Sequence, residues 1–457
     1  MTKAFISSAI SLLVDDDHLP DVGWTAPVSQ LIRDDFVLAD SRYTEMVTVE
    51  DILSHRTGLA EYVYSSFDLW NQSLHNAKAF HSQDNAFLGI YSKTPDNLKS
   101  VTRKLRHLPL SAPLRTKYQY CNAMYVVATH LVETLTGMWI GDFLRQKIWE
   151  PLQMKETYFG VDDVAEHKML DQLAKGYRWD ETASSYVEVP WPIQPEAAGA
   201  GEMKSTVLDI ASFLRCMIRK TSPLSPDAHA ELIKPRTIVN PEEELKPFHS
   251  HPLYALGWEI ETYHGETVVG HDGCTNGFAS KMLYLPRLDW GVVILGNKMD
   301  AHRAQEKICW TMIDDLLGVE EGKRFDWDGY WQKDADEPEC KTKEELYPDL
   351  PEKRIPLTLP IEKYAGEYRD EGYGTMVVHC EDGKLQVDAR DRTWRFKLEF
   401  EHVTGEFFIA EMLDVDTMSR GTMRAQFRIG ADGGVSELGI AFVEELEDEK
   451  IWFHRVR

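Results

Sequence analysis

The sequence has 457 residues, which is too long for a single hydrophobic core and predicts two or three domains. Hydrophobic residues make up 43% of it and 13 residues are tryptophan, so we expect a globular, soluble protein with a large core. The formal charge of −25 argues against nucleic acid and anionic membranes as partners, because both require a basic surface.

The cysteines are scattered, and no two of them form a Cys-x-x-Cys pair. This pattern predicts free thiols in a reducing compartment, and hence a cytoplasmic protein, rather than a disulfide framework or a zinc site. We expect no metal and no cofactor. The six positions are Cys121, Cys216, Cys274, Cys309, Cys340 and Cys380.

The chain opens with an apolar helical run that ends at Val14, directly before three aspartates. Its apolar residues cover almost the whole circumference, which is typical of a buried helix. A secretory signal also begins with a lysine and an apolar run, but no small-residue cleavage site follows here. The run is too short to span a bilayer. We therefore expect a core helix.

Lys3 stands at the N-terminal end of this helix, where the helix dipole opposes a cation. A buried lysine is unfavourable unless it is paired or its pKa falls. Lys3 is therefore a candidate base, or a partner for a nucleophile. The alternative is a frayed, solvated chain end.

The next elements are weaker. Thr48 begins a capping box for a short helix that carries Ile52 and Leu53, and Gly58 is placed to end it. Residues 60–115 are mixed aromatic and polar, and we interpret them as a lid or wall of a site.

A clear helix follows, with Asn122 as its N-cap and Gly137 at its end. Tyr120-Cys121-Asn122 thus lies on the loop that enters the helix, where side chains are free to face a cleft. Tyr120 could equally be a core tyrosine whose hydroxyl finds a backbone partner. Farther on, the small residues Ala197–Gly201 predict a flexible loop that allows close backbone approach, or else a plain tight turn.

From residue 254 the period changes to that of short strands separated by Gly, Asp and Pro turns. They predict an antiparallel meander, with a helix at 304–317 packed on it and a first domain that ends near Gly318. The expected strands are 254–261, 267–270, 278–285 and 291–295. His271-Asp272-Gly273 follows the second of them and leads to Cys274; a turn histidine before a glycine is the alternative interpretation.

Residues 319–356 are rich in Glu, Lys, Asp and Pro and predict a linker. Residues 357–457 alternate as short strands and predict a small all-β sheet or barrel. The expected strands are 374–379, 384–387, 393–400, 406–411, 422–429 and 451–457. The fold class is therefore α+β: an antiparallel sheet flanked by helices, followed by a barrel-like domain.

Three pieces combine: Lys3 on a buried helix, Tyr120 with Asn122 at a helix entry, and His271 with Gly273 after a strand. Each alone is weak, and the order and contexts together are much more specific. They resemble the serine β-lactamase and penicillin-binding-protein family, in its class C and esterase branch. That family carries Ser-x-x-Lys at the start of a buried helix, Tyr-x-Asn on a loop, and Lys- or His-x-Gly on a strand edge.

The resemblance covers residues 1 to about 318, including the stretches 54–59, 151–154 and 198–201. The C-terminal part resembles the lipocalin-like β domain that is appended to some members. The family fold also begins with a helix and two strands ahead of Ser-x-x-Lys. Without them we expect an unpaired sheet edge and an exposed apolar face.

The resemblance implies acyl-enzyme chemistry. Lys3 and Tyr120 would share the task of activating a serine hydroxyl, and His271 would line the opposite wall. Asn122 would bind an amide or ester group of the substrate. The oxyanion would be held by the nucleophile's own N–H and by that of Cys274, beside Gly273.

Met1-Thr2-Lys3 is similar to the last three residues of Ser-x-x-Lys, so the serine itself is not among these 457 residues. Three explanations stand. The chain is truncated at an internal methionine, or it is a pseudoenzyme that binds without being acylated, or Thr2 or Ser7 replaces the nucleophile. Neither replacement occupies the position three residues before Lys3 that the geometry requires.

The sequence therefore predicts a hydrolase-type domain acting on a small-molecule ester or amide, inactive as written. A non-catalytic binding protein and an acyltransferase of secondary metabolism are the alternatives.

Overall fold

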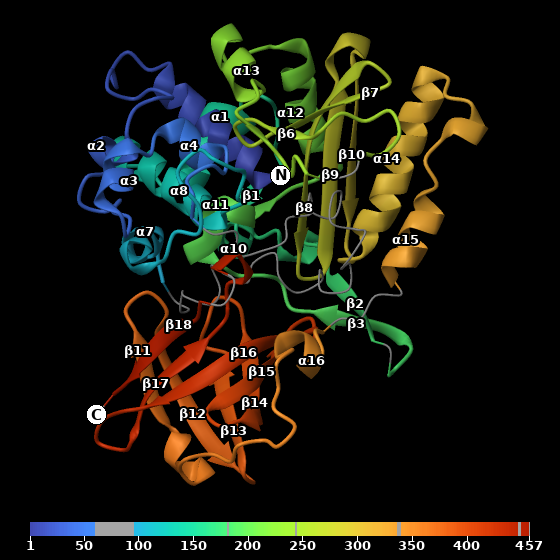
Figure 1. Cartoon of the computed structure of the whole chain (residues 1–457). Helices are drawn as coiled ribbons and strands as arrows, with labels where there is room; N and C mark the ends of the chain where they lie inside the picture. The colour runs from blue at the N-terminus through green and yellow to red at the C-terminus, as the bar shows by residue number, and fades with distance from the viewer. Residues whose placement is uncertain (60–95, 181, 243–244, 336–339, 447–448, 457) are drawn as a thin grey trace.

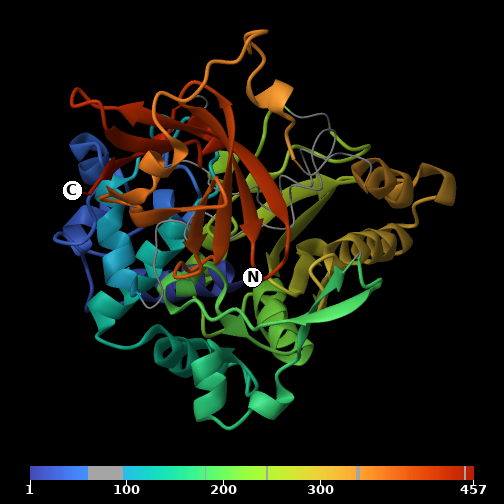
Figure 2. The same cartoon turned by 90° about the horizontal axis from the view of Figure 1, so that it is seen from below.

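The computed structural model describes residues 1–59, 96–180, 182–242, 245–335, 340–446 and 449–456. Its upper part in Figure 1 combines a helical half with an antiparallel sheet, and a β-barrel lies below the helical half. Seen from below in Figure 2, the barrel again covers the helical side and leaves α14 and α15 beside it. The expected α+β class with a barrel-like C-terminal part is confirmed.

Helix α1 (Thr2–Val14) is buried along nearly its whole length, as predicted from its apolar circumference. Ala4, Phe5 and Ile6 have no exposed surface. The buried serines of the helix are accommodated because their hydroxyls bond to the helix backbone: Ser8 Oγ donates to the carbonyl of Ala4 at 2.8 Å. A helix enclosed in this way fixes the position of its N-terminal end.

The first part has further helices, of which α8, α9, α11 and α13 pack against α1. Their bounds are α2 (Val28–Leu31), α3 (Ser41–Met46), α4 (Val49–Leu53), α7 (Leu98–Lys104), α8 (Asn122–Thr136), α9 (Ile140–Leu144), α10 (Val161–Glu166), α11 (Ala198–Gly201), α12 (Val207–Arg219), α13 (Pro226–Leu232) and α14 (Ala301–Leu317). The N-cap of α8 is Cys121, so Asn122 is its first residue rather than its cap. Most of the predicted lid or wall, residues 60–95, lies outside the described residues; the rest carries α7.

The main sheet is antiparallel and has the strand order β10-β9-β8-β7-β6-β5, which confirms the predicted meander. Its strands are β5 (Thr237–Ile238), β6 (Leu253–Tyr254), β7 (Glu259–Tyr263), β8 (Glu266–Thr275), β9 (Phe278–Leu285) and β10 (Trp290–Gly296). Helix α14 packs on one face, and α12 packs on the other against β9 and β10. Strand β10 ends the sheet, with β9 as its partner among the described strands.

Strand β8 is longer than predicted. It continues through His271-Asp272-Gly273 to Thr275, so these residues lie within a strand and do not follow one. Its pairing with β7 stops at Glu259–Gly270, whereas its pairing with β9 continues to Thr275–Phe278. Residues 271–275 therefore pair with a described strand on one side only.

Two small sheets complete the first part. They pair β1 (Tyr158–Phe159) with β4 (Met203–Lys204), and β2 (Gly176–Asp180) with β3 (Ser185–Val189). The segment expected as a linker carries the helices α15 (Trp327–Ala335) and α16 (Lys343–Leu346). Trp327 and Trp331 belong to the apolar cluster between α14 and the sheet, so α15 packs on the first part, whereas Leu346 of α16 packs on the barrel.

The C-terminal strands close into an eight-stranded barrel. They are β11 (Gly366–Asp370), β12 (Gly374–Glu381), β13 (Lys384–Ala389), β14 (Phe396–Thr404), β15 (Phe407–Asp414), β16 (Arg420–Ile429), β17 (Val435–Ile440) and β18 (Ile451–Arg455). Strands β11 and β17 were not predicted. Alternating residues such as Phe396, Leu398 and Phe400 point inward and fill the interior.

Among the residues described, no helix combines the length and the apolar character needed to cross a membrane.

Candidate active site

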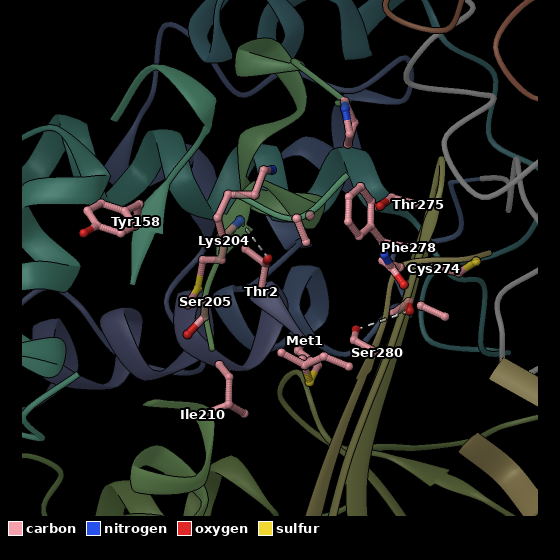
Figure 3. A pocket seen from close by; sticks show the side chains of 18 of the residues that line it. Met1, Thr2, Tyr158, Lys204, Ser205, Ile210, Cys274, Thr275, Phe278 and Ser280 are labelled. Carbon is pink, nitrogen blue, oxygen red and sulfur yellow. Dashed lines mark hydrogen bonds between the residues drawn. The ribbon is translucent and has the colours of Figure 1, made fainter. Parts of the chain in front are cut away.

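A cavity of about 590 Å³ lies where the N-terminal end of α1 meets β8. Its inner wall contains every residue that the sequence analysis proposed for the site: Lys3, Tyr120, Asn122, His271, Gly273 and Cys274. The structure thus brings together residues that are up to 271 positions apart. Figure 3 shows Met1 and Ser280 facing each other between α1 and the sheet. The catalytic roles of the six residues stay a prediction.

Much of the cavity lining is apolar. Its apolar lining includes Tyr158, Met169, Leu173, Trp191, Ile210 and Phe278. Lys204 adds a cation there, which is paired with Glu202 at 3.1 Å. The cavity can therefore take a bulky apolar group beside the polar inner wall.

Lys3 is 3% exposed, and its amine is held by polar groups from two other elements. Nζ donates to Asn122 Oδ1 at 2.7 Å and to the carbonyl oxygen of Ala200 at 3.1 Å. It also lies over the Tyr120 ring, 4.7 Å from the ring centroid. These contacts compensate for the burial of the amine and fix it on the cavity wall.

The open edge of β8 faces the end of α1. The backbone nitrogen of Met1 donates to the carbonyl oxygen of Asp272 at 2.9 Å, so Asp272 turns its backbone polar groups toward the cavity. Because backbone direction alternates along a strand, the N–H of Cys274 points to the same side. Gly273 between them permits this approach: a Cβ there would lie 3.2 Å from the Met1 nitrogen.

His271 is buried on the cavity wall, and both of its ring nitrogens have partners. Nδ1 lies 2.5 Å from the carbonyl oxygen of Asp272, and Nε2 lies 3.1 Å from the Tyr254 hydroxyl. Burial first, and then neighbouring positive charge that includes Lys3, holds the pKa of His271 well below its usual value. The partners assign a neutral ring that donates from Nδ1 to the carbonyl oxygen of Asp272 and accepts at Nε2 from the Tyr254 hydroxyl.

His55 is a site residue that the sequence reasoning missed. It is fully buried, its Nδ1 accepts from the backbone N–H of Cys121 at 2.9 Å, and its ring centroid lies 4.3 Å from that of Tyr120. Burial and then Lys3 lower its pKa well below the usual value. His55 therefore orients the loop that carries Tyr120 and Asn122. The stretch 54–59 was noted as part of the resemblance, but no local pattern marks His55 as buried.

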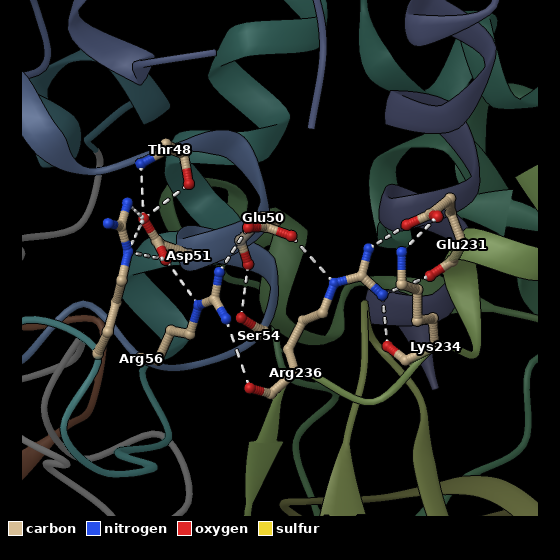
Figure 4. Close-up of polar contacts among 9 residues, drawn as sticks. Thr48, Glu50, Asp51, Ser54, Arg56, Glu231, Lys234 and Arg236 are labelled. Atoms are coloured by element: carbon tan, nitrogen blue, oxygen red, sulfur yellow. Dashed lines mark hydrogen bonds and ion pairs between the residues drawn. The ribbon is translucent and has the colours of Figure 1, made fainter. Parts of the chain in front are cut away.

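A network of ion pairs holds the segment around His55 (Figure 4). Asp51 has no exposed side-chain surface and accepts from Arg56 at 2.6 Å and from Arg115 at 2.7 Å. Glu50 links Arg56 to Arg236, at 2.6 and 3.0 Å. Burial raises the pKa of Asp51, but hydrogen bonds from Arg115 and its other partners outweigh burial and leave the pKa below its usual value.

Of the two suggested replacement nucleophiles, Thr2 lines the cavity and Ser7 does not. Thr2 Oγ1 accepts from the backbone N–H of Met203 at 3.3 Å. Ser7 is fully buried, 3.4 Å from the Tyr125 hydroxyl, and is not part of the cavity lining. Burial also raises the pKa of the Cys121 thiol to about 11, which leaves that thiol unreactive.

One cluster has ligand-type atoms close together. Atoms of Glu259, His271 and Asp272 lie within 4.8 Å of one another. Both nitrogens of His271 already have partners. Burial, and then the charge of Asp272, raises the pKa of Glu259 well above its usual value, which makes this carboxyl harder to deprotonate and a poorer ligand. We assign no metal to this cluster.

Comparisons with known proteins agree with the family resemblance and with the fold. The family model described as beta-lactamase matches residues 1–308, and a domain of unknown function matches residues 350–455. An unguisins hydrolase of Aspergillus campestris is 35% identical, over 99% of this chain and 81% of that protein. An unguisins hydrolase of Aspergillus violaceofuscus is also 35% identical, over 100% of this chain and 80% of that protein.

Among solved structures, the octameric penicillin-binding protein homologue from Pyrococcus abyssi matches with a TM-score of 0.55 at 20% identity. The match covers 99% of this chain and 86% of that one. At this identity the likeness concerns the fold.

Proposed function

The chain belongs to the beta-lactamase family, and from this premise we propose that its site serves acyl-enzyme hydrolysis of an amide or ester bond in a small molecule. The beta-lactamase model and the hydrolase relatives support serine-hydrolase-type chemistry. Because two of these relatives are unguisins hydrolases, unguisins are the first substrates to test.

One observation carries the proposal. The Lys3 amine sits between Asn122 and the Tyr120 ring, on a cavity whose other wall is the open edge of β8. A base, an amide-binding group and strand N–H groups therefore face one space that is large enough for a small substrate.

The reaction needs a hydroxyl beside Lys3. In the proposed mechanism, a serine three positions before Lys3 attacks the substrate carbonyl carbon, and its proton passes to the base formed by Lys3 and Tyr120. The N–H of Cys274 and that of the serine hold the oxyanion. The bond to the leaving amine or alcohol then breaks as that group takes up the proton. Water finally hydrolyses the acyl-enzyme.

The 457 residues contain no serine at that position. We propose that a polypeptide consisting of these 457 residues alone binds the substrate without being acylated, whatever precedes them in a longer protein. The two other interpretations concern the same site: an acyltransferase, in which an alcohol replaces water, and a protein that only binds.

The test compares two chains with a nitrophenyl ester, by absorbance burst and by mass mapping of the labelled peptide. The chain as written should give no burst and no acylated peptide. The chain with one serine added directly before Met1 should be acylated on that serine. Lys3→Met or Tyr120→Phe in the extended chain should slow acylation by about 100-fold or more.

Acylation of the unextended chain at any residue would refute its inertness, and the mass map would name the nucleophile. A folded extended chain that stays unlabelled would refute the proposed site. A further assay adds an alcohol and measures the ratio of new ester to free acid. A transferase should give mainly the ester, and a hydrolase mainly the acid.

A further inference from the structure

The barrel contacts the segment that holds Lys3, and it does so through a buried carboxyl group. Glu196 lies in the 3₁₀ turn Pro195–Ala197, directly before α11, and its side chain has no exposed surface. Its Oε1 accepts a hydrogen bond from the hydroxyl of Thr393, in the connection between β13 and β14. A carboxylate buried this completely is stable only where hydrogen bonds replace its hydration.

The barrel side of this contact is held firmly. Arg392 is 1% exposed and donates to the carbonyl of Tyr373 and, at 2.6 Å, to that of Thr375. On the other side of Thr393, the indole N–H of Trp394 donates to the buried carboxyl of Asp414. Thr393 is thus flanked by two side chains that are anchored inside the barrel.

The site end of the contact is equally constrained. Gly199 lies against α8 so closely that a Cβ there would be 2.1 Å from Thr129 Oγ1 and 2.2 Å from the carbonyl oxygen of Tyr125. One residue later, the carbonyl of Ala200 accepts from Lys3 Nζ at 3.1 Å. Glu196 and Ala200 are one helical turn apart, so a shift at Glu196 reaches the Lys3 acceptor directly.

The same segment is closed at its ends by Glu202. Its Oε1 accepts from the backbone N–H of Gln194 at 2.8 Å, and its Oε2 pairs with Lys204. Residues 194–202 are therefore a short closed loop that makes a polar contact with the barrel through Glu196 and Thr393. The barrel and the helical part also share one continuous apolar cluster, and Gly372 of the β11–β12 turn packs on Leu108. Figure 2 shows the barrel lying against the helical side of the first part.

We propose that Thr393 and Glu196 are positioning residues: through them the barrel braces residues 195–201 and holds the Ala200 carbonyl on the Lys3 amine. This assigns a role to the domain of unknown function at residues 350–455. The inference rests on the proposed role of Lys3, but its test does not require turnover.

The test measures Thr393→Val, which removes the hydroxyl at nearly constant volume, against wild type and Thr393→Ser, which keeps the hydroxyl. Thr422→Val is the matched control, because Thr422 also lies in the barrel and its hydroxyl donates to the carbonyl of Lys341, outside the site. Two measurements, both read by mass spectrometry, report how firmly this segment is held. Hydrogen exchange of the peptide 196–202 reports its local opening, and competitive acetylation reports the accessibility of the Lys3 amine.

In Thr393→Val we expect exchange of 196–202 to be about tenfold faster, because a buried carboxyl loses its donor. Labelling of Lys3 should rise in parallel, since the same local opening exposes the amine. Thr393→Ser and Thr422→Val should match wild type. In the serine-extended chain, Thr393→Val should lower kcat for the ester and leave KM unchanged.

Exchange and Lys3 labelling within about twofold of wild type, in a folded Thr393→Val protein, would overturn the proposal. If that variant does not fold, Glu196→Leu removes the acceptor on the other side of the same contact, and wild-type exchange in it would also overturn the proposal. The serine-extended chain could stay unacylated while Thr393→Val still raises exchange of 196–202 and labelling of Lys3. That result would refute the proposed hydrolysis and would support the positioning role of Thr393 and Glu196.

Discussion

Replacing Asp51 by asparagine removes the charge at the centre of the ion-pair network in Figure 4. The carboxylate has no exposed surface, whereas its partners Arg56 and Arg115 are 15% and 41% exposed. Arg115 can therefore regain water when Asp51 is lost, and Arg56 largely cannot. Breaking a buried pair by removing one partner costs about 3 to 5 kcal/mol, and we expect about 3 kcal/mol because one partner is half-exposed.

The measurement is urea unfolding at pH 7, followed by tryptophan fluorescence. Asp40→Asn is the matched control: it breaks the pair with Arg42, whose side chain is 79% exposed, and it should destabilise the protein much less, because water replaces an exposed partner. If Asp51→Asn and Asp40→Asn destabilise equally, the network does not stabilise the segment around His55, and our account of that segment is wrong.

The same variant has a defined pH dependence. The folded pKa of Asp51 lies below its usual value, so its contribution to stability is complete above the unfolded pKa of about 4 and is lost as the pH falls through the folded pKa. The free-energy difference between wild type and Asp51→Asn should therefore shrink as the pH falls below about 4. A difference that grows with acid would contradict the assigned direction.

Two further predictions concern the site. Gly199→Ala should destabilise the protein by about 2 kcal/mol or more because the added Cβ meets α8, whereas Gly322→Ala, with open space around it, should be neutral within about 0.5 kcal/mol by urea unfolding. The pKa values of His55 and His271 are lowered by burial, which favours the neutral rings in the folded protein. Because the unfolded chain binds these protons below about pH 6.5, stability should fall as the pH drops below that value, and histidine NMR should show two rings that titrate at a lower pH than a free histidine.

Local patterns predicted the long elements and failed where contacts are distant. The apolar circumference of residues 2–14 and the spacing after Asn122 gave α1 and α8, because each burial pattern repeats within a single element. The closure of the barrel could not be predicted, since it depends on pairing Tyr368 with Arg455 at opposite ends of the domain. Ala197–Gly201 was predicted as a flexible loop or a plain turn and is helical, because five small residues carry no periodicity.

The candidate site was predictable in its composition and not in its support. Lys3, Tyr120 and His271 carry chemistry that a motif can name. His55 and Glu196 are buried polar residues. With their partners they hold the segments that carry the site residues, and they can do so because they are buried. Burial of a polar side chain depends on residues that are far away in the sequence. His55 meets Cys121 across 66 positions, and Glu196 meets Thr393 across 197.

The cavity exists because two neighbouring strands part. Strand β7 pairs with β8 as far as Glu259–Gly270. The chain just before β7 passes over α1 at Gly257. Gly257 has φ +73°, and a Cβ there would lie 2.8 Å from the carbonyl oxygen of Lys3, so only glycine lets the helix end enter the gap. The same parting leaves residues 271–275 with polar backbone groups directed at the helix end. The parting of β7 and β8 therefore makes room for Lys3 and also exposes the edge of β8 opposite it. For this reason the Lys3 amine and the strand N–H groups face the same cavity, although no long side chain connects the two walls.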